Sequence, residues 1–330
     1  MYKIKQLLED FVVRELSSIE LGSGQYSYFF LKKTNYATLD ALQILANKFK
    51  IPLKNFGFAG NKDKRALTEQ KISIFKGKKD FEQTRFNNIE LRFLGNGKKP
   101  ISLGELEGNE FTITIRNLTD DGIKKIRSIQ DKKLKIPNLY GPQRFSKNNQ
   151  FIGKAIIKRE FKKATELILE NNGKTEGKIG LYIMNNKNDY IGAINLIPFK
   201  TRKLFVHSYQ SFLFNKVVEE YLKNNSKIKN IKIPIIGFNF EINSIKNQTI
   251  KKITEKILEE EKIKPRDFII NQMPELSSEG SLRDLFFEFK DLKILEINDD
   301  ELNQNTKRIK INFTLPKSCY ATVLLEYVLQ

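Results

Sequence analysis

Residues 111–115 alternate apolar and polar side chains, and this pattern restricts the fold more than any other feature of the sequence. Phe111, Ile113 and Ile115 lie on one side of an extended strand, while the two threonines between them lie on the other. Such a strand buries one face and leaves the other face open. The pattern therefore predicts a sheet that covers a core on one side.

The rest of the first third adds further strands and two helices. The segment from Thr38 to Lys50 places apolar residues on one helical face, with Thr38 as its cap and Pro52 beyond its end. A second helix is expected to begin near Thr119. The other predicted strands cover residues 10–15, 26–31, 56–60, 72–75 and 89–94. Together these elements predict an α+β fold with a mainly antiparallel sheet.

The middle of the chain has helical character instead. Apolar residues at helical spacing predict three helices, over residues 151–170, 204–222 and 249–262. A short strand pair is expected within 231–240, and strand character returns at 309–313. Polar turns are expected at 171–174 and 224–227, and no internal repeat is present.

The chain carries a large excess of positive charge. Of its 330 residues, 58 are Lys or Arg and 39 are Asp or Glu, so the net charge is +19. Such an excess favours a polyanionic partner, because cations that neutralise phosphates release condensed counterions. The chain is also rich in Lys, Ile and Asn throughout, and this bias would raise the charge of any protein. Charge alone therefore favours nucleic acid without establishing it, and no segment resembles a membrane-surface helix.

The chain has one Cys, Cys319, and one His, His207. These counts exclude an intramolecular disulfide, a cysteine zinc cluster and a multi-histidine site, so no metal is expected. We expect Cys319 to be a small buried thiol, and His207, at a helix start, to have a structural or capping role. The chain begins with no apolar signal core, and no apolar run approaches the ~18 residues of a membrane span. We therefore expect a cytoplasmic protein.

Residues 57–70 form the segment best suited to chemistry. Two glycines free the backbone after an apolar strand, and Asp63 follows, flanked by the cations Lys62, Lys64 and Arg65. Nearby cations favour the ionised acid and offer contacts to phosphate oxygens. An anionic Asp in such a loop can act on a nucleotide as nucleophile or general base. An exposed turn explains the same residues equally well, and the segment does not match a P-loop.

Three other segments combine residue types that suit contacts with RNA. Asn109 precedes Phe111 by two positions on a strand, so both side chains point to the same side. A Pro- and Gly-containing loop over residues 136–146 carries Arg144, and a Pro turn after the last strand presents Tyr320. Each segment alone is also compatible with a purely structural role.

Taken together and in order, these segments resemble the TruD family of pseudouridine synthases, which modify uridine-13 of tRNA. The resemblance covers nearly the whole chain and is most specific at residues 59–70, AGNKDKRALTEQ. The other matching motifs are residues 10–15 (DFVVRE), 140–145 (YGPQRF), 211–215 (SFLFN) and 320–322 (YAT), with Glu326. This chain departs from the family pattern in having Tyr26 in place of His, Ser146 in place of Gly, and Ser318-Cys319 before the terminal aromatic residue.

The resemblance implies a role for each matching residue. Asp63 is then the catalytic nucleophile, and Phe111 packs on the target base. Phe11, Asn109 and Tyr320 contact the target nucleotide. The cations expected at RNA phosphates are Lys5, Lys62, Lys64, Arg65 and Arg144.

The resemblance also implies the architecture and the partners. Residues 1–135 and 290–330 would form a discontinuous catalytic domain with a mainly antiparallel mixed sheet, and residues 136–289 an inserted α/β TRUD domain. The reaction is a neutral rearrangement that needs no cofactor, and we expect a monomer that binds tRNA. A non-catalytic RNA-binding protein on the same fold, or pseudouridylation of other RNAs, remains an alternative. A metal-dependent nuclease would need a cluster of acids, whereas Asp63 and Glu69 are the only acids near the key loop.

Overall fold

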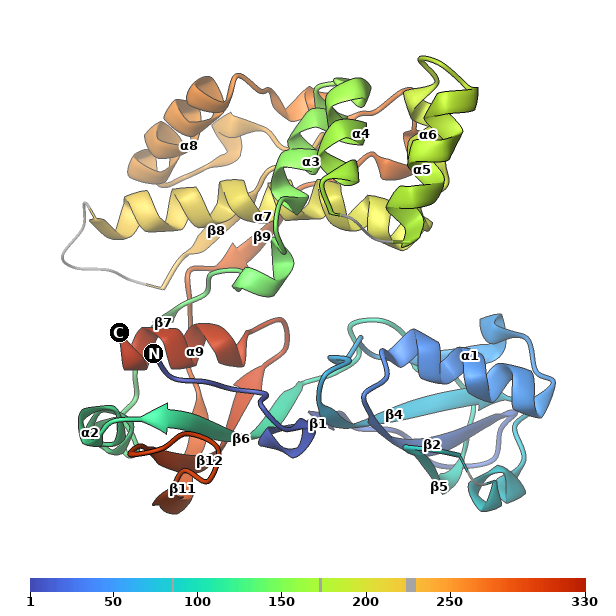
Figure 1. Ribbon diagram of the computed structural model, residues 1–330, viewed down its shortest axis with the longest axis vertical. Helices are drawn as coiled ribbons and strands as arrows, with labels where there is room; N and C mark the ends of the chain where they lie inside the picture. The colour runs from blue at the N-terminus through green and yellow to red at the C-terminus, as the bar shows by residue number, and fades with distance from the viewer. Residues whose placement is uncertain (85, 172–173, 224–229) are drawn as a thin grey trace. The chain divides into compact units, whose positions relative to one another are not determined.

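The protein folds into two compact units, each with a hydrophobic core of its own (Figure 1). The first unit comprises Met1–Ile136 and Phe287–Gln330, and the second comprises Pro137–Phe286. The computed structural model describes residues 1–84, 86–171, 174–223 and 230–330.

The first unit is built on an eight-stranded sheet. Its strands are β1 (Phe11–Leu16), β2 (Tyr26–Thr34), β3 (Phe56–Phe58), β4 (Leu67–Phe75), β5 (Ile89–Gly97), β6 (Gly108–Leu118), β11 (Lys290–Asp299) and β12 (Lys307–Pro316). They follow the order β11-β12-β6-β1-β4-β2-β5, with β3 on β4. β1 and β4 run parallel, and the other pairs run antiparallel. This mixed sheet confirms the predicted α+β class.

Helices cover one side of this sheet. α1 (Thr38–Phe49) packs Leu42 and Leu45 into one core with Phe29 and Leu31 of β2. α9 (Ala321–Leu329) lies over β6 and β12 on the same side as α1, and α2 (Asp120–Ser128) follows β6 (Figure 1). The side that α1 covers also holds the loop between β3 and β4.

The alternation at residues 111–115 is confirmed on its apolar side. Phe111, Ile113 and Ile115 are all buried in β6. Thr114 is buried as well, so the opposite face of β6 is less open than the pattern predicts.

The second unit is mainly helical. Its helices are α3 (Asn149–Ile157), α4 (Phe161–Leu169), α5 (Lys174–Asn185), α6 (Tyr190–Asn195), α7 (Phe199–Lys223) and α8 (Gln248–Glu261). Within it, β8 (Lys232–Ile235) pairs with β9 (Ser281–Asp284). β7 (Ile136–Pro137) and β10 (Phe286–Phe287), which pair with each other, are the two places where the chain passes from one unit to the other. α3 packs closely on α7, since a Cβ atom at Gly153 would lie 2.1 Å from the carbonyl oxygen of Phe205.

Several expectations for this unit are wrong. The helix predicted over residues 151–170 is two helices, because Arg159 adopts a left-handed φ of 61° between α3 and α4. The strand near residue 233 pairs with β9, more than 40 residues further along the chain, and not with its immediate neighbour. The polar turn predicted at 224–227 and part of the one at 171–174 lie outside the described residues.

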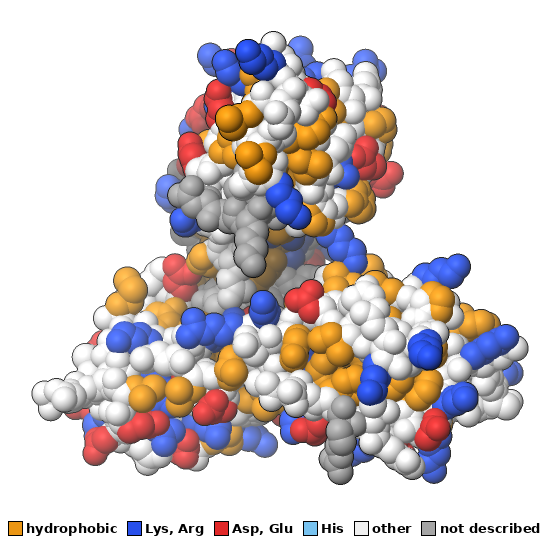
Figure 2. Space-filling view, turned by 45° about the vertical axis from the view of Figure 1, so that its right-hand side comes forward, with side chains coloured by type: hydrophobic (Ala, Val, Ile, Leu, Met, Phe, Trp, Pro, Cys, Tyr) orange, Lys and Arg blue, Asp and Glu red, His pale blue; other side chains and the backbone are white. Residues whose placement is uncertain are grey.

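Two features are absent from the described residues. No helix among them is both long and apolar enough to cross a membrane. No group of three or more His, Cys, Asp or Glu residues among them is placed to hold a metal ion. On the face shown in Figure 2, Lys and Arg side chains are spread over the surface and do not gather in one patch.

Candidate active site

Two buried polar side chains, those of Thr38 and Gln70, hold the loop between β3 and β4 in place. The hydroxyl of Thr38 donates to Oε1 of Gln70 at 2.9 Å and accepts the main-chain N–H of Lys62, also at 2.9 Å. Nε2 of Gln70 donates to the carbonyl oxygen of Gly60 at 3.1 Å. Thr38 is therefore not the helix cap that the sequence predicts: Ala37 is the N-cap residue of α1, and no side chain caps that helix. The hydroxyl fixes the loop instead.

A buried ion pair ties the same loop to β1. Nζ of Lys62 lies 2.7 Å from Oε2 of Glu15, and the two side chains are 5% and 0% exposed. Removing one partner of such a pair leaves an uncompensated buried charge, at a typical cost of roughly 3–5 kcal/mol. Lys62 therefore helps to hold the loop in place, and it could contact a phosphate only if its ion pair with Glu15 were broken.

Asp63 follows Lys62 in this loop, and its carboxylate is partly exposed. Nζ of Lys5 lies 2.6 Å from Oδ2 of Asp63, and the two side chains are 12% and 40% exposed. Lys5 reaches Asp63 from a left-handed backbone conformation, with a φ of 60°, which residues other than Gly rarely adopt. The same ammonium lies 4.0 Å from the ring centroid of Phe11. Lys5 therefore orients the Asp63 carboxylate and joins it to the aromatic side chains of the sheet.

Three phenylalanines form an apolar floor beside this ion pair. The rings of Phe11 and Phe111 meet edge to face with centroids 6.1 Å apart, and Phe111 stacks on Phe313 at 5.6 Å. Strand register explains the cluster, because Phe111 of β6 lies opposite Val13 of β1 and Phe313 of β12. Phe11 and Phe111 are 3% and 7% exposed, so they also belong to the core.

Asn109 lies on the same face of β6 as Phe111. It is opposite Glu15 of β1 and Leu315 of β12. Its Oδ1 atom is buried and has no hydrogen-bond partner among the described residues. A buried acceptor without a partner costs free energy, so Asn109 is suited to receive a donor from a bound molecule.

The other predicted site residues are more scattered. Lys64 and Arg65 are exposed on the loop itself, and Tyr320 is partly buried at the N-terminus of α9. Arg144 belongs to the second unit, where its Nε donates to Oγ of Ser211 at 3.1 Å and its guanidinium lies over the Tyr140 ring. Contacts and register thus bring Lys5, Phe11, Asp63, Asn109 and Phe111 together within the first unit.

The single His and the single Cys lie outside this group. His207 lies two turns inside α7 and not at its start, so it caps nothing. Burial, and then the charges of Arg144 and Lys203, lower the pKa of His207 to about 4. Cys319 is partly buried rather than fully buried, with Sγ 3.7 Å from the carbonyl oxygen of Lys317.

Sequence reasoning missed Lys33, which is 0% exposed beneath the loop. Its Nζ donates to the carbonyl oxygens of Tyr36 at 2.6 Å and Asp63 at 3.3 Å. Burial, partly offset by the charge of Asp63, lowers the pKa of Lys33 to about 8. A signal was available, because position 33 continues the buried stripe of Phe29 and Leu31 on β2.

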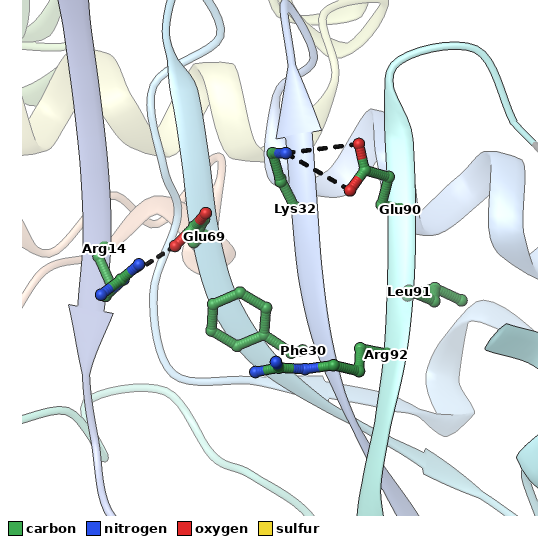
Figure 3. Close-up of a pocket in the computed structure, with 7 residues that line it drawn as sticks. All are labelled: Arg14, Phe30, Lys32, Glu69, Glu90, Leu91 and Arg92. Carbon is green, nitrogen blue, oxygen red and sulfur yellow. Dashed lines mark hydrogen bonds and ion pairs between the residues drawn. The ribbon is translucent and has the colours of Figure 1, made fainter.

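A hollow on the opposite face of the sheet is separate from this site (Figure 3). Strand alternation turns Lys32 and Glu69 away from the face that carries Lys33 and Thr68. In the hollow, Nε of Arg14 lies 2.9 Å from Glu69, and Nζ of Lys32 lies 3.4 Å from Glu90. Arg92 also lines the hollow, over the ring of Phe30, so three cations face two acids there and most of the positive charge is paired.

Comparison with known proteins identifies the family. The family model described as "tRNA pseudouridine synthase D (TruD)" matches residues 2–180, 174–233 and 223–328. The chain is 30% identical to the tRNA pseudouridine synthase D of Aquifex aeolicus, over 98% of this chain and 97% of that protein. It is 30% identical to a protein of Methanosarcina acetivorans named "Probable tRNA pseudouridine synthase D", over 99% and 92%.

A solved structure agrees with these matches. A crystal structure from Methanosarcina mazei, described under the same family name, superposes with a TM-score of 0.70 and 27% identity, covering 99% of this chain and 93% of that one. The matches span nearly the full length on both sides. This chain therefore belongs to the tRNA pseudouridine synthase D (TruD) family.

Proposed function

We propose that this protein isomerises uridine to pseudouridine in tRNA, at position 13 in the D-arm, with Asp63 as the single catalytic carboxylate. The observation that carries the proposal is a partly exposed carboxylate, held 2.6 Å from a lysine ammonium, beside an aromatic floor. Membership of the TruD family supports the same reaction. We place the enzyme in the cytoplasm, as a monomer.

The target uridine has to leave its stack before its glycosidic bond can be reached. Extrusion costs a few kcal/mol, which stacking on aromatic side chains and phosphate contacts offset. Lys64 and Arg65 are exposed and suited to hold phosphates beside Asp63, and we assign Arg144 the same role in the second unit. The ion pairs of Lys5 and Lys62 compete with phosphate binding, so we give these two lysines a lesser part in it.

The bond changes follow from the product. Asp63 assists cleavage of the bond between uracil N1 and ribose C1′, as a nucleophile or as a base. The detached uracil turns, and its C5 forms a new bond to C1′. C5 then loses its proton and N1 gains one, so atoms and electrons balance without an oxidant, a reductant or ATP.

The pocket has to retain the free base while it turns. Phe11 and Phe111 supply an apolar floor, and Tyr320 is an aromatic contact to the target nucleotide. The unpartnered Oδ1 of Asn109 is suited to accept a ring N–H of uracil. We therefore assign Asn109 the clamp on the base.

The replacement Asp63→Asn tests the proposal. With an unmodified tRNA transcript in single turnover, we expect the rate of pseudouridine formation to fall by about 10²–10⁴-fold, the usual contribution of a positioned acid or base. Transcript binding should persist. The matched control is Asp121→Asn, since Asp121 is an exposed acid of α2.

Mapping the modified positions and strand breaks separates the alternatives. A rate for Asp63→Asn close to that of the wild type would refute the catalytic assignment. Binding by the wild-type protein without pseudouridine would favour a non-catalytic RNA-binding protein, and strand breaks would favour a nuclease. Pseudouridine at another position would correct the substrate.

A further inference from the structure

The Lys33 ammonium has unusual surroundings for a cation. Lys33 is 0% exposed, yet it takes part in no ion pair among the described residues. Its hydrogen-bond partners there are two main-chain carbonyl oxygens, those of Tyr36 and Asp63. Thr68 lies opposite Lys33 on β4 but accepts no hydrogen bond from it, since the buried Oγ1 of Thr68 has no hydrogen-bond partner in the described part of the chain.

A cation in this position is not explained by the packing of the sheet. Phe29 and Leu31 precede it on the same face of β2, and both are fully buried and apolar. An apolar residue at position 33 would continue that core, whereas a buried ammonium loses its hydration and gains no carboxylate in return. The contacts that distinguish Lys33 from its neighbours are its hydrogen bonds to the carbonyl oxygens of Tyr36 and Asp63.

Two lysines therefore hold Asp63 from two sides. Lys5 binds the carboxylate at 2.6 Å, and Lys33 donates to the main-chain carbonyl of the same residue at 3.3 Å. The two lysines come from separate segments, one before β1 and one at the end of β2. Lys33 also donates a hydrogen bond to the carbonyl oxygen of Tyr36, in the turn that leads into α1. These two bonds fix the loop relative to that helix.

We propose that Lys33 is a positioning residue for Asp63, whose buried ammonium fixes the main chain of Asp63 and thereby the direction of its carboxylate. This inference rests on the proposed function of Asp63. Lys33 itself touches no substrate, because it is fully buried beneath the loop. Its removal should slow the chemical step and leave RNA binding almost unchanged.

The test is Lys33→Met, which keeps the length and apolar stem of the side chain and removes the ammonium. We expect the single-turnover rate of pseudouridine formation to fall by about 10–100-fold, since misplacing a reacting group by about 1 Å costs about 10²-fold. The Kd for tRNA should stay within about twofold. The matched control is Lys71→Met, because Lys71 of β4 also donates to a main-chain carbonyl, that of Ser17, but on the opposite face of the sheet.

The pH profile provides a readout that a purely structural role would not change. The charged groups that act on Lys33 are Asp63 and Lys62 of the loop and Asp40 of α1. Its pKa of about 8 means that the ammonium loses its proton as the pH rises through 8. The wild-type rate should therefore fall between pH 7 and 9, whereas Lys33→Met should lack this decline.

Two results would overturn the inference. One is a Lys33→Met rate within twofold of the wild type. The other is a loss of rate that appears only at temperatures where circular dichroism shows the variant unfolding. If the wild-type enzyme itself forms no pseudouridine, the proposed function fails, and that result is distinct from either of these.

Discussion

At the scale of single residues, the site depends on polar groups that the fold buries. Thr38 and Gln70 are 1% and 0% exposed, and together they satisfy the N–H of Lys62 and the carbonyl of Gly60. These hydrogen bonds stabilise the fold because they keep buried donors and acceptors paired. The shape of the loop that carries Asp63 thus depends on two side chains that are buried beneath it.

Replacing Thr38 by Val tests this dependence. Val has the shape of Thr without the hydroxyl, so Oε1 of Gln70 and the N–H of Lys62 each lose a partner. We expect the free energy of unfolding to fall by roughly 1–3 kcal/mol, the cost of an unsatisfied buried polar group, as measured by urea denaturation. Thr38→Ser keeps the hydroxyl and should lose much less. Equal stability of the two variants would contradict the role assigned to the hydroxyl.

Part of the site was predictable from its residues, and part was not. The sequence marks Asp63 because three cations surround it next to two glycines, and it marks Asn109 and Phe111 by their spacing on a strand. It does not mark Lys33, because two adjacent lysines are normally expected to be exposed. Only the structure shows that Lys33 lies on the same buried face as Phe29 and Leu31. Thr38 was predicted as a helix cap because local sequence does not reveal a partner 32 residues away.

At the scale of elements, local pattern predicted the strands near the site and failed where pairing is distant. β6 and β12 have strong alternation, and both were expected. β11 was missed because most of its side chains are exposed or partly buried, so it lacks a clear apolar face. The break between α3 and α4 was missed because Arg159 takes a left-handed conformation without the Gly or Pro that usually indicates one.

α7 carries the only His of the chain, and we expect this residue to make the stability of the second unit depend on pH. Burial lowers the pKa of His207 to about 4, whereas the unfolded chain protonates it near 6.5. The unfolded state therefore binds more protons between these values, so this group lowers stability as the pH falls from 6.5 to 4 and has no effect above 7.

The variant His207→Gln isolates that response, because it leaves no His in the chain. Thermal melts should show a smaller loss of Tm between pH 7 and 5 for the variant than for the wild type. An identical pH dependence for both proteins would mean that His207 is charged or exposed in the folded state. The wild type at pH 7.5 serves as the reference, since His207 is neutral there in both the folded and the unfolded state.

At the scale of the whole molecule, the net charge of +19 comes from many cations, and those on the face shown in Figure 2 are spread over that face. Many cations lie on exposed helix faces, as Lys162 and Lys163 do on α4. Their contribution to RNA binding should be small unless they lie against a phosphate. The salt dependence of binding counts the phosphates that are neutralised, so it separates the two kinds of cation.

The double replacement of Lys64 and Arg65 by Gln tests this distinction. If each holds one phosphate, the slope of log K against log salt concentration should become less steep by about 2 for the tRNA. Replacing Lys162 and Lys163 by Gln removes the same charge from α4 and should leave the slope unchanged. Equal effects of the two double variants would indicate that overall charge, not position, determines binding.

The order of the strands in the first unit has a consequence for folding on the ribosome. β6 ends at Leu118, but β12, which pairs along its edge, begins at Lys307, so the whole second unit is synthesised in between. Throughout that time the edge of β6 that β12 later covers has main-chain N–H and C=O groups without a strand partner, and such an edge can pair with other chains. We expect a nascent chain that is arrested before β12 to need a chaperone, and the sheet that supports Asp63 to close only after β12 has been synthesised.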